Sequence, residues 1–249
     1  MNRYLAFTAS IPAETQYVLE AMENPRKITL GQRLAYKGKL FGRPIIVMIT
    51  GVGKVNAAQS ITALLENTEI ETVIVSGCGG AYISSGLDIG DIAVATEEIY
   101  GDEGVSLPDG WQSLEGIGIP MFEKQQKRYF NWFPLNSKLA NKVVDILKTG
   151  PIKAKVLSGP FITVSQVSGS REIGELLYQR FQGICENMEG AAIAHICTLY
   201  DIPLLEIRAI SNMVEDRQLS HWNKTIAIQN SQNAILEVVK HWKEVMCQF

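Results

Sequence analysis

Short apolar runs rich in β-branched residues alternate along this chain with longer segments of helical period. The short runs predict strands at residues 4–8, 33–40, 44–50, 72–76 and 92–96, near 155–167, around 184, and at 203–210. The longer segments predict helices at residues 12–22, 56–65, 137–147, 171–181, 189–200 and 222–242. The proline at position 12 suits the first turn of the first helix.

This order of elements predicts an α/β protein, a three-layer α/β/α arrangement with a mixed central β-sheet. Because no internal repeat and no linker rich in proline, serine or charge interrupts the pattern, we expect residues 1–249 to form a single domain. Periodicity is lost only between residues 101 and 134, and a loop of that length is usually functional or contains an unrecognised element. Ligands of such sheets bind at the carboxyl ends of the strands, so the loops that follow strands are the candidate sites.

Composition and charge narrow the classes of partner. Apolar residues make up 46% of the 249 positions, charged residues 20%, and the formal net charge is −3, so we expect no nucleic-acid or membrane surface. The four cysteines are widely scattered, which disfavours structural zinc and disulfides and predicts reduced thiols in the cytoplasm. No apolar run approaches the ~20 residues that a membrane helix needs. We therefore expect a soluble, cytoplasmic protein without a metal site.

Two glycine clusters follow predicted strands. In residues 51–54 the P-loop pattern fails, because Met48 stands where it needs glycine and Val55 where it needs serine or threonine. Residues 77–82 lack the last glycine of the dinucleotide fingerprint, so nicotinamide cofactors are disfavoured as well. Each cluster is either a tight strand-to-helix turn or a bare backbone that a flat ligand can approach closely. In the second interpretation the candidate contacts are Gly79 and Gly80.

The carboxyl half of the chain carries polar residues at two strand ends. Residues 186–195 run from a short strand into a helix of small residues, and we expect Glu189 in the first helical turn. That position suits an ordinary helix-start acid as well as a functional carboxylate. Residues 207–210 form the end of a strand, and the polar pair Ser211 and Asn212 follows it. No Gly-x-Ser-x-Gly elbow is present, which disfavours a serine hydrolase.

Taken together, three segments resemble the nucleoside phosphorylase and nucleosidase family. Its purine members carry a Gly-[Ile/Val]-Gly-Lys-Val-Asn-Ala-Ala turn, a Met-Glu-[Gly/Ala]-Ala-Ala helix start and an Arg-x-Ile-Ser-[Asp/Asn] strand end. Residues 51–58, 188–192 and 208–212 match these motifs, and their order and spacing fit along nearly the whole chain. The resemblance implies a cofactor-free enzyme that cleaves the ribosyl bond of a small purine nucleoside. It also implies a homo-oligomer, most simply a dimer.

The resemblance makes Glu189 and Met188 the ribose contacts, with Asn187 beside them. Cleavage of a purine ribosyl bond builds positive charge on the sugar and negative charge on the departing base. A carboxylate can accept hydrogen bonds from both ribose hydroxyls and stabilise the cationic sugar. A thioether offers the sugar an adaptable apolar surface.

At the base, methylthioadenosine nucleosidases place an aspartate that serves N7, whereas this chain has Asn212 next to Ser211. An amide has two N–H donors and one carbonyl acceptor, so it can donate to the 6-oxygen of hypoxanthine and suits a 6-amino group less well. We therefore interpret Asn212 as a selector for 6-oxopurines. Residues 163–169 correspond to the base-stacking loop of the family, where relatives often have phenylalanine and this chain has Gln166 and Val167.

The anion site separates hydrolases from phosphorylases. The hexameric phosphorylases carry arginines near the second glycine turn and in the amino-terminal loop, whereas residues 75–79 and 8–14 contain no cation. Glu14 stands where nucleosidases keep a carboxylate that positions or activates water, although an acid after Pro12 also suits an ordinary helix start. The chain is therefore expected to be a hydrolase.

Within the family, residues 186–190 and 211–212, together with Arg217 and Trp222, are most similar to hydrolases that release hypoxanthine from a nucleoside of menaquinone biosynthesis. Three alternatives stay open at this point. They are a methylthioadenosine/S-adenosylhomocysteine-type nucleosidase, a purine nucleoside phosphorylase, and a purine-nucleoside binding protein without turnover.

Overall fold

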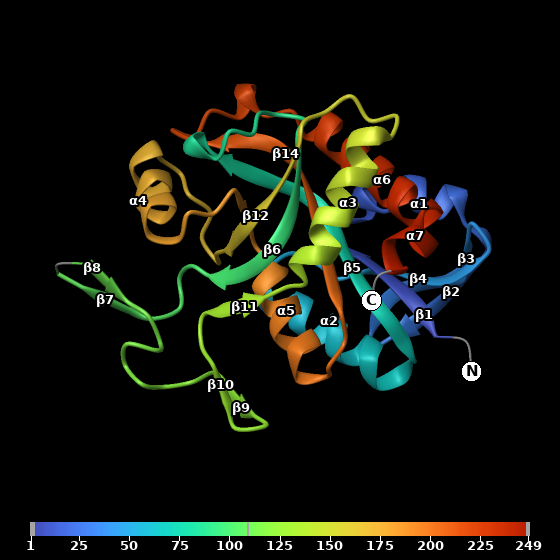
Figure 1. Cartoon of the computed structure of the whole chain (residues 1–249), viewed down its shortest axis with the longest axis horizontal. Helices are drawn as coiled ribbons and strands as arrows, with labels where there is room; N and C mark the ends of the chain where they lie inside the picture. Colours follow the sequence, from blue (N-terminus) through green and yellow to red (C-terminus); the bar gives the residue numbers. More distant parts are fainter. Residues whose placement is uncertain (1–2, 109, 248–249) are drawn as a thin grey trace.

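A mixed ten-stranded sheet forms the centre of the computed structural model, which describes residues 3–108 and 110–247 (Figure 1). In spatial order its strands are β11 (Trp132–Pro134), β6 (Ile92–Tyr100), β12 (Val156–Thr163), β13 (Cys185–Asn187), β5 (Ile70–Tyr82), β1 (Tyr4–Ala9), β4 (Arg43–Ile49), β3 (Arg33–Leu40) and β2 (Glu23–Leu30). The tenth strand, β14 (Leu204–Val214), pairs in parallel with β5 and antiparallel with β6. The predicted mixed sheet is confirmed.

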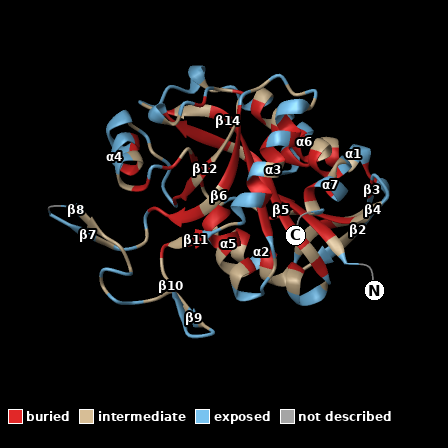
Figure 2. Ribbon diagram, viewed as in Figure 1, coloured by how far each residue is buried: buried red, intermediate tan, exposed pale blue. Residues whose placement is uncertain are grey.

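Helices cover both faces of this sheet. On one face, α2 (Lys54–Asn67) and α5 (Gly190–Leu199) bury residues such as Ile61 and Ile193 in one apolar cluster. On the other, α1 (Gln16–Ala21), α3 (Ser137–Thr149), α6 (Lys224–Lys240) and α7 (Trp242–Met246) build a second cluster. Figure 2 shows that buried residues follow the sheet and the helix faces turned toward it. The three-layer α/β/α prediction is therefore confirmed.

Side-chain caps fix where three helices begin. Asn136, Ser170 and Asn223 each accept a hydrogen bond from the backbone N–H three residues ahead, at 3.1, 3.4 and 3.1 Å. These caps start α3, α4 (Arg171–Phe181) and α6. The first two begin at the residues that the periodicity predicts, because the cap and the apolar pattern coincide in the sequence.

The segment between residues 101 and 134 contains the unrecognised structure that its length suggested. Two small hairpins, β7 (Val105–Leu107) with β8 (Gly110–Gln112) and β9 (Phe122–Lys124) with β10 (Lys127–Tyr129), extend from the body (Figure 1). Strand β11 then adds an edge to the main sheet beside β6. The buried Asn131 anchors the segment, since its amide donates to the carbonyls of Tyr100 and Glu103 at 3.1 and 2.8 Å.

The second glycine cluster is not a turn. Residues 77–80 lie inside β5, which continues to Tyr82 because β13 and β14 both pair with its distal half. Gly80 stands opposite Glu186 of β13 and opposite Asn212 of β14. The turn interpretation is therefore wrong for this cluster and correct for the first one, which joins β4 to α2.

Other differences lie at element boundaries. The expected helix at 12–22 is a short 3-10 turn, η1 (Pro12–Glu14), followed by α1, and further 3-10 turns are η2 (Ile83–Ser85) and η3 (Leu219–His221). Strand β2 was not expected, because its sequence is mostly polar and exposed and only Ile28 and Leu30 pack against the core. The closing helix divides into α6 and α7. Within the described ranges, no helix is long and apolar enough to cross a membrane.

Trp242 of α7 is fully buried, and its Nε1 donates to Glu71 Oε1 at 3.1 Å. We expect Trp242→Ala to lower the free energy of unfolding by about 3–5 kcal/mol, because it empties a core site. Trp242→Phe keeps a ring there and loses the hydrogen bond, so its loss is about 1–2 kcal/mol. Urea unfolding of the three proteins measures both differences. Equal losses in the two variants would contradict this account of the core.

Candidate active site

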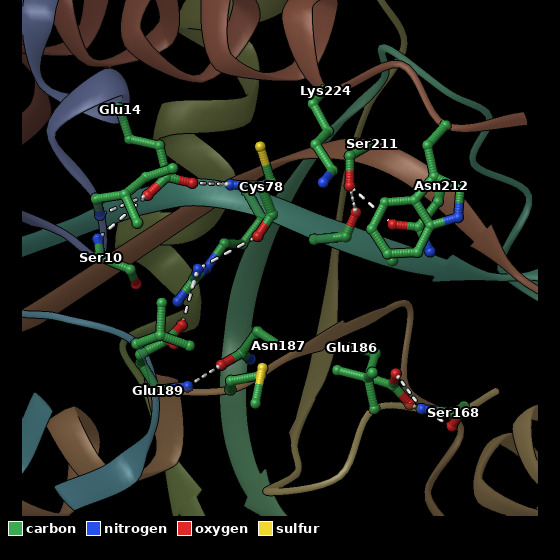
Figure 3. Close-up of a pocket in the computed structure, with 18 of the residues that line it drawn as sticks. Ser10, Glu14, Cys78, Ser168, Glu186, Asn187, Glu189, Ser211, Asn212 and Lys224 are labelled. Carbon is green, nitrogen blue, oxygen red and sulfur yellow. Dashed lines mark hydrogen bonds and ion pairs between the residues drawn. The ribbon is translucent and has the colours of Figure 1, made fainter. Parts of the chain in front are cut away.

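An open cavity of about 360 Å³ lies beside the distal halves of β5, β13 and β14 (Figure 3). That volume is within the range of small-molecule sites. Nine of the ten site residues expected from the sequence line this cavity: Glu14, Gly79, Gly80, Val167, Asn187, Met188, Glu189, Ser211 and Asn212. The tenth, Gln166, is exposed and is not among the lining residues, so its contact with a ligand stays a prediction.

Glu14 is a buried carboxylate held by the backbone. Its Oε2 accepts hydrogen bonds from the N–H groups of Ser10 and Ile11 at 3.2 and 3.3 Å, and its Oε1 accepts from the N–H of Cys78 at 2.9 Å. Its position in η1 is the helix start after Pro12, but its side chain also reaches across to β5. The helix-start interpretation therefore describes its place in the chain, and the water-positioning role stays a prediction.

Glu189 is placed by an unusual helix start. It stands one residue before α5, at the cap position and not in the first turn as expected, and its side chain caps nothing in that helix. Asn187 takes over this role, since its Oδ1 accepts from the N–H groups of Glu189 and Gly190 at 2.9 and 2.7 Å. The Glu189 carboxylate is thereby free to accept from the N–H of Gly53 at 2.8 Å.

Arg208 is the buried cation of the site. Its Nε donates to Glu206 Oε1 at 2.8 Å, while its Nη1 lies 3.4 Å from Glu189 Oε2 and 3.3 Å from the carbonyl oxygen of Cys78. Its Nη2 has no hydrogen-bond partner among the described residues, although it is buried. Burial alone would lower the pKa of Arg208, but the neighbouring carboxylates, Glu206 first, raise it above its ordinary value.

A β-bulge turns two consecutive side chains toward the cavity. The pairing of β14 with β5 shifts by one residue between Ile210 and Asn212, which leaves Ser211 unpaired. The Ser211 hydroxyl lies 2.8 Å from Asn212 Oδ1 and 3.2 Å from the carbonyl oxygen of Gly79. Donation from the Ser211 hydroxyl to Oδ1 orients the Asn212 amide. One N–H of Asn212 Nδ2 then donates to the carbonyl oxygen of Met213 at 3.1 Å, and the second N–H is available to a ligand.

Glu186 faces the same cavity from β13. Its carboxylate accepts from the N–H and the hydroxyl of Ser168 at 2.9 and 2.6 Å and from the Tyr82 hydroxyl at 3.2 Å. Burial raises the pKa of Glu186, and the hydrogen bonds from Ser168 counteract part of that effect. Because Glu186 and Asn212 flank Gly80 on the two neighbouring strands, they are polar groups on opposite sides of a bare strip of backbone.

The remaining lining residues add little nucleophilic chemistry. Burial first, and then the Glu14 carboxylate, raise the pKa of the Cys78 thiol to about 12, so this thiol stays protonated at neutral pH. The rim of the cavity consists of the exposed Arg217 and Lys224 and the half-buried Trp222, and both cations lie over the indole ring. In the described part of the chain, no three His, Cys, Asp or Glu side chains are grouped to hold a metal ion.

The family model described as the phosphorylase superfamily matches residues 4–241, which is nearly the whole chain. The chain belongs to the phosphorylase superfamily. The futalosine hydrolase of Thermus thermophilus is 32% identical over 202 residues, which cover 81% of this chain and 84% of that relative.

Solved superfamily structures share the fold. The 5′-methylthioadenosine/S-adenosylhomocysteine nucleosidase of Neisseria meningitidis, in complex with methylthio-immucillin-A, has a TM-score of 0.82 at 25% identity and covers 96% of this chain and 99% of its own. The futalosine hydrolase of Helicobacter pylori strain 26695 has a TM-score of 0.81 at 21% identity, and the match covers 96% of this chain and 98% of that structure's chain. At 21% identity the latter likeness concerns the fold alone.

Sequence reasoning missed two polar residues that line this cavity. Arg208 belongs to the strand-end motif at residues 208–212, which indicates no role for it, and Glu186 belongs to residues 186–190, where the motif points to Met188 and Glu189 instead. Alternation along β14 could have found Arg208, because a charged residue inside an apolar strand needs a buried partner. No local signal identifies Glu186, since its place beside Gly80 depends on strand pairing.

Proposed function

We propose that this chain is a futalosine hydrolase, which cleaves the N-glycosidic bond of futalosine with water and releases hypoxanthine. The observation that carries the proposal is the division of the cavity into two parts. One part gathers the carboxylates of Glu14 and Glu189 around Arg208, and the other carries Asn212 and Glu186 on either side of Gly80. The name of the Thermus thermophilus relative supports the substrate.

The charged part suits a sugar that becomes cationic. Among the described residues, Glu189 accepts from the Gly53 N–H and from Arg208 alone, so its carboxylate has lone pairs left for ribose hydroxyls. The half-buried Met188 lines the cavity next to it and offers a thioether surface to the sugar. A fixed negative charge at this place stabilises the developing oxocarbenium ion without any reorganisation of the site.

Glu14 is the proposed base for the attacking water. Three backbone N–H groups hold its carboxylate, and an ionised carboxyl group has about four acceptor positions. One position therefore remains for a water molecule, which Glu14 orients and whose proton it accepts as the bond to the sugar forms. Arg208, with its unpartnered Nη2, is available to hold the same water.

The charge balance favours water over phosphate as nucleophile. Arg208 is surrounded by three carboxylates, those of Glu206, Glu189 and Glu14. The buried end of the cavity is therefore net negative and repels a phosphate dianion. A neutral water molecule meets no such repulsion.

The part of the cavity that carries Asn212 and Glu186 suits a 6-oxopurine. The free N–H of Asn212 can donate to the 6-oxygen of hypoxanthine, and Glu186 can accept from N1–H, which hypoxanthine carries and adenine lacks. Gly79 and Gly80 line the cavity between them and place no side chain in it. The two side chains thus read adjacent positions on one edge of the base.

The other proposed properties follow the family resemblance. The substrate is a small purine nucleoside, no cofactor takes part, and the chain assembles as a homo-oligomer, most simply a dimer. A cytoplasmic location fits the four free cysteines.

The Neisseria meningitidis relative makes a methylthioadenosine/S-adenosylhomocysteine-type nucleosidase the second candidate. The polar groups beside Gly80 separate the two, because a 6-amino group and an unprotonated N1 are poorly matched to Asn212 and Glu186.

Glu189→Gln should fold normally and lose activity, because it removes the negative charge that stabilises the cationic sugar. A loss of about 10²–10³ in kcat is expected. The assay is hypoxanthine release from futalosine, with Glu172→Gln on the exposed start of α4 as the matched control. Near-normal turnover in a folded Glu189→Gln protein would remove this carboxylate from the mechanism.

Rates should be the same in phosphate-free buffer and in millimolar phosphate, since the buried charge of the site repels the anion. The product should be the free sugar and not its 1-phosphate, as separated by chromatography. Formation of the phosphorylated sugar would identify a phosphorylase, and absence of any base release from futalosine, inosine and methylthioadenosine would identify a binding protein.

Futalosine should be cleaved far faster than its 6-amino counterpart, by roughly 10⁴ in kcat/KM for a well-formed polar pairing. Asn212→Asp should reduce this ratio, because an ionised carboxylate repels the 6-oxygen and accepts from a 6-amino group. Asn67→Asp on the exposed end of α2 is the control for the substitution itself. An unchanged ratio in Asn212→Asp would show that this side chain does not read the base.

A further inference from the structure

Two carboxyl groups meet behind the cavity. Glu98 of β6 and Glu206 of β14 are both completely buried. A Cβ on Gly190, the first residue of α5, would overlap both Glu98 Oε1 and Glu206 Oε2. The two acids therefore fill the space that the missing side chain of Gly190 leaves.

The hydrogen bonds of this pair are complete except for one atom. Glu98 accepts from the Thr163 hydroxyl at 2.6 Å and from Asn187 Nδ2 at 2.8 Å. Glu206 Oε1 accepts from Arg208 Nε at 2.8 Å, whereas Glu206 Oε2 has no donor within the described residues. Two ionised carboxylates cannot share a dry site at contact distance, and a proton on Glu98 supplies the donor that Glu206 Oε2 lacks.

We propose that Glu98 and Glu206 share one proton and act as a positioning pair for the site. Glu206 fixes the guanidinium of Arg208, and Glu98 fixes Asn187, whose Oδ1 in turn holds the backbone of Glu189. The proton joins these two supports into one unit. The kinetic consequences rest on the proposed function, whereas the presence of the proton does not.

The thiols, phenols and guanidinium around the pair do not titrate near neutral pH. The charged or titratable groups near the pair are Arg208, Glu189, Glu186, Cys185, Cys197, Tyr82 and Tyr100. Burial raises the pKa of both thiols and both phenols, so they remain protonated at neutral pH, and Arg208 remains charged. Burial first, and then Glu206, raise the pKa of Glu98, and burial raises that of Glu206.

Because the pKa values of the pair are raised in the folded chain, its stability falls as pH rises. The folded chain keeps a proton that the unfolded chain releases above the ordinary glutamate pKa, so stability is lost as pH rises from there through the pKa of the folded pair. One such proton makes the unfolding equilibrium constant rise about tenfold per pH unit in that window. The pKa of Glu186 is also raised, so its titration adds the same pH dependence of stability to every variant that retains Glu186.

Glu206→Gln is the decisive variant. Its amide oxygen can accept from Arg208, and its amide N–H can donate to Glu98, so the pair needs no proton. In urea unfolding above pH 5, wild type should lose stability more steeply than Glu206→Gln, by about tenfold in the equilibrium constant per pH unit. The exposed Glu69→Gln should parallel wild type. Parallel curves for wild type and Glu206→Gln overturn the shared proton.

If Glu206→Gln does not fold, infrared spectra of the wild-type protein can detect the shared proton directly. A carbonyl band of a protonated carboxylic acid should be present at neutral pH in wild type and in Glu186→Gln. Absence of the band from both proteins overturns the proposal, and so does a band in wild type that Glu186→Gln lacks. Neither measurement uses substrate, so its outcome is independent of the proposed function.

The positioning role has its own readout. In Glu206→Gln we expect kcat to fall about tenfold with KM nearly unchanged, because a neutral acceptor holds Arg208 less firmly in the transition state. Wild-type kcat should also decline at alkaline pH as the pair loses its proton, and this decline should be absent from Glu206→Gln. A variant with wild-type kcat and the wild-type pH profile overturns the positioning role while leaving the hydrolase assignment intact.

Discussion

The guanidinium of Arg208 is the charge around which the rest of the site is arranged. Moving an ion of this kind out of water costs several kcal/mol unless it is paired and hydrogen-bonded. Strand β14 supplies one partner itself, because Glu206 and Arg208 are two residues apart and therefore share a face of the sheet. The second partner is Glu189, which lies at the cap position of α5. One cation thus joins strand β14 to the start of α5.

This requirement explains the irregular backbone near the cavity. Glu189 cannot both cap α5 and pair with Arg208, so the cap is transferred to Asn187, and Thr163 Oγ1 accepts from the N–H of Ala191 at 2.8 Å. The bulge at Ser211 is the corresponding irregularity on β14, and it brings two polar side chains to the opposite part of the cavity. Both departures from regular structure place polar groups where a regular element would hide them.

Local patterns predicted most elements of the fold and the site residues that belong to contiguous motifs. Periodicity and caps found α4, and the superfamily motifs found Glu189 and Asn212, which the structure places around one cavity. Pairing between distant strands could not be predicted in this way. Strand β5 continues through four glycine-rich positions only because β13 and β14 lie beside it, and the contact of Glu98 with Glu206 joins strands more than 100 residues apart in the sequence.

The glycine of the Met-Glu-[Gly/Ala]-Ala-Ala motif acquires a physical meaning from this contact. In this chain alanine at position 190 has no room, because two carboxyl groups occupy the volume of its methyl group. The choice between glycine and alanine is therefore coupled to two residues on distant strands. A buried acid pair that looks costly for stability is retained because it holds Arg208 and Asn187 at once, and these residues orient the carboxylate of Glu189.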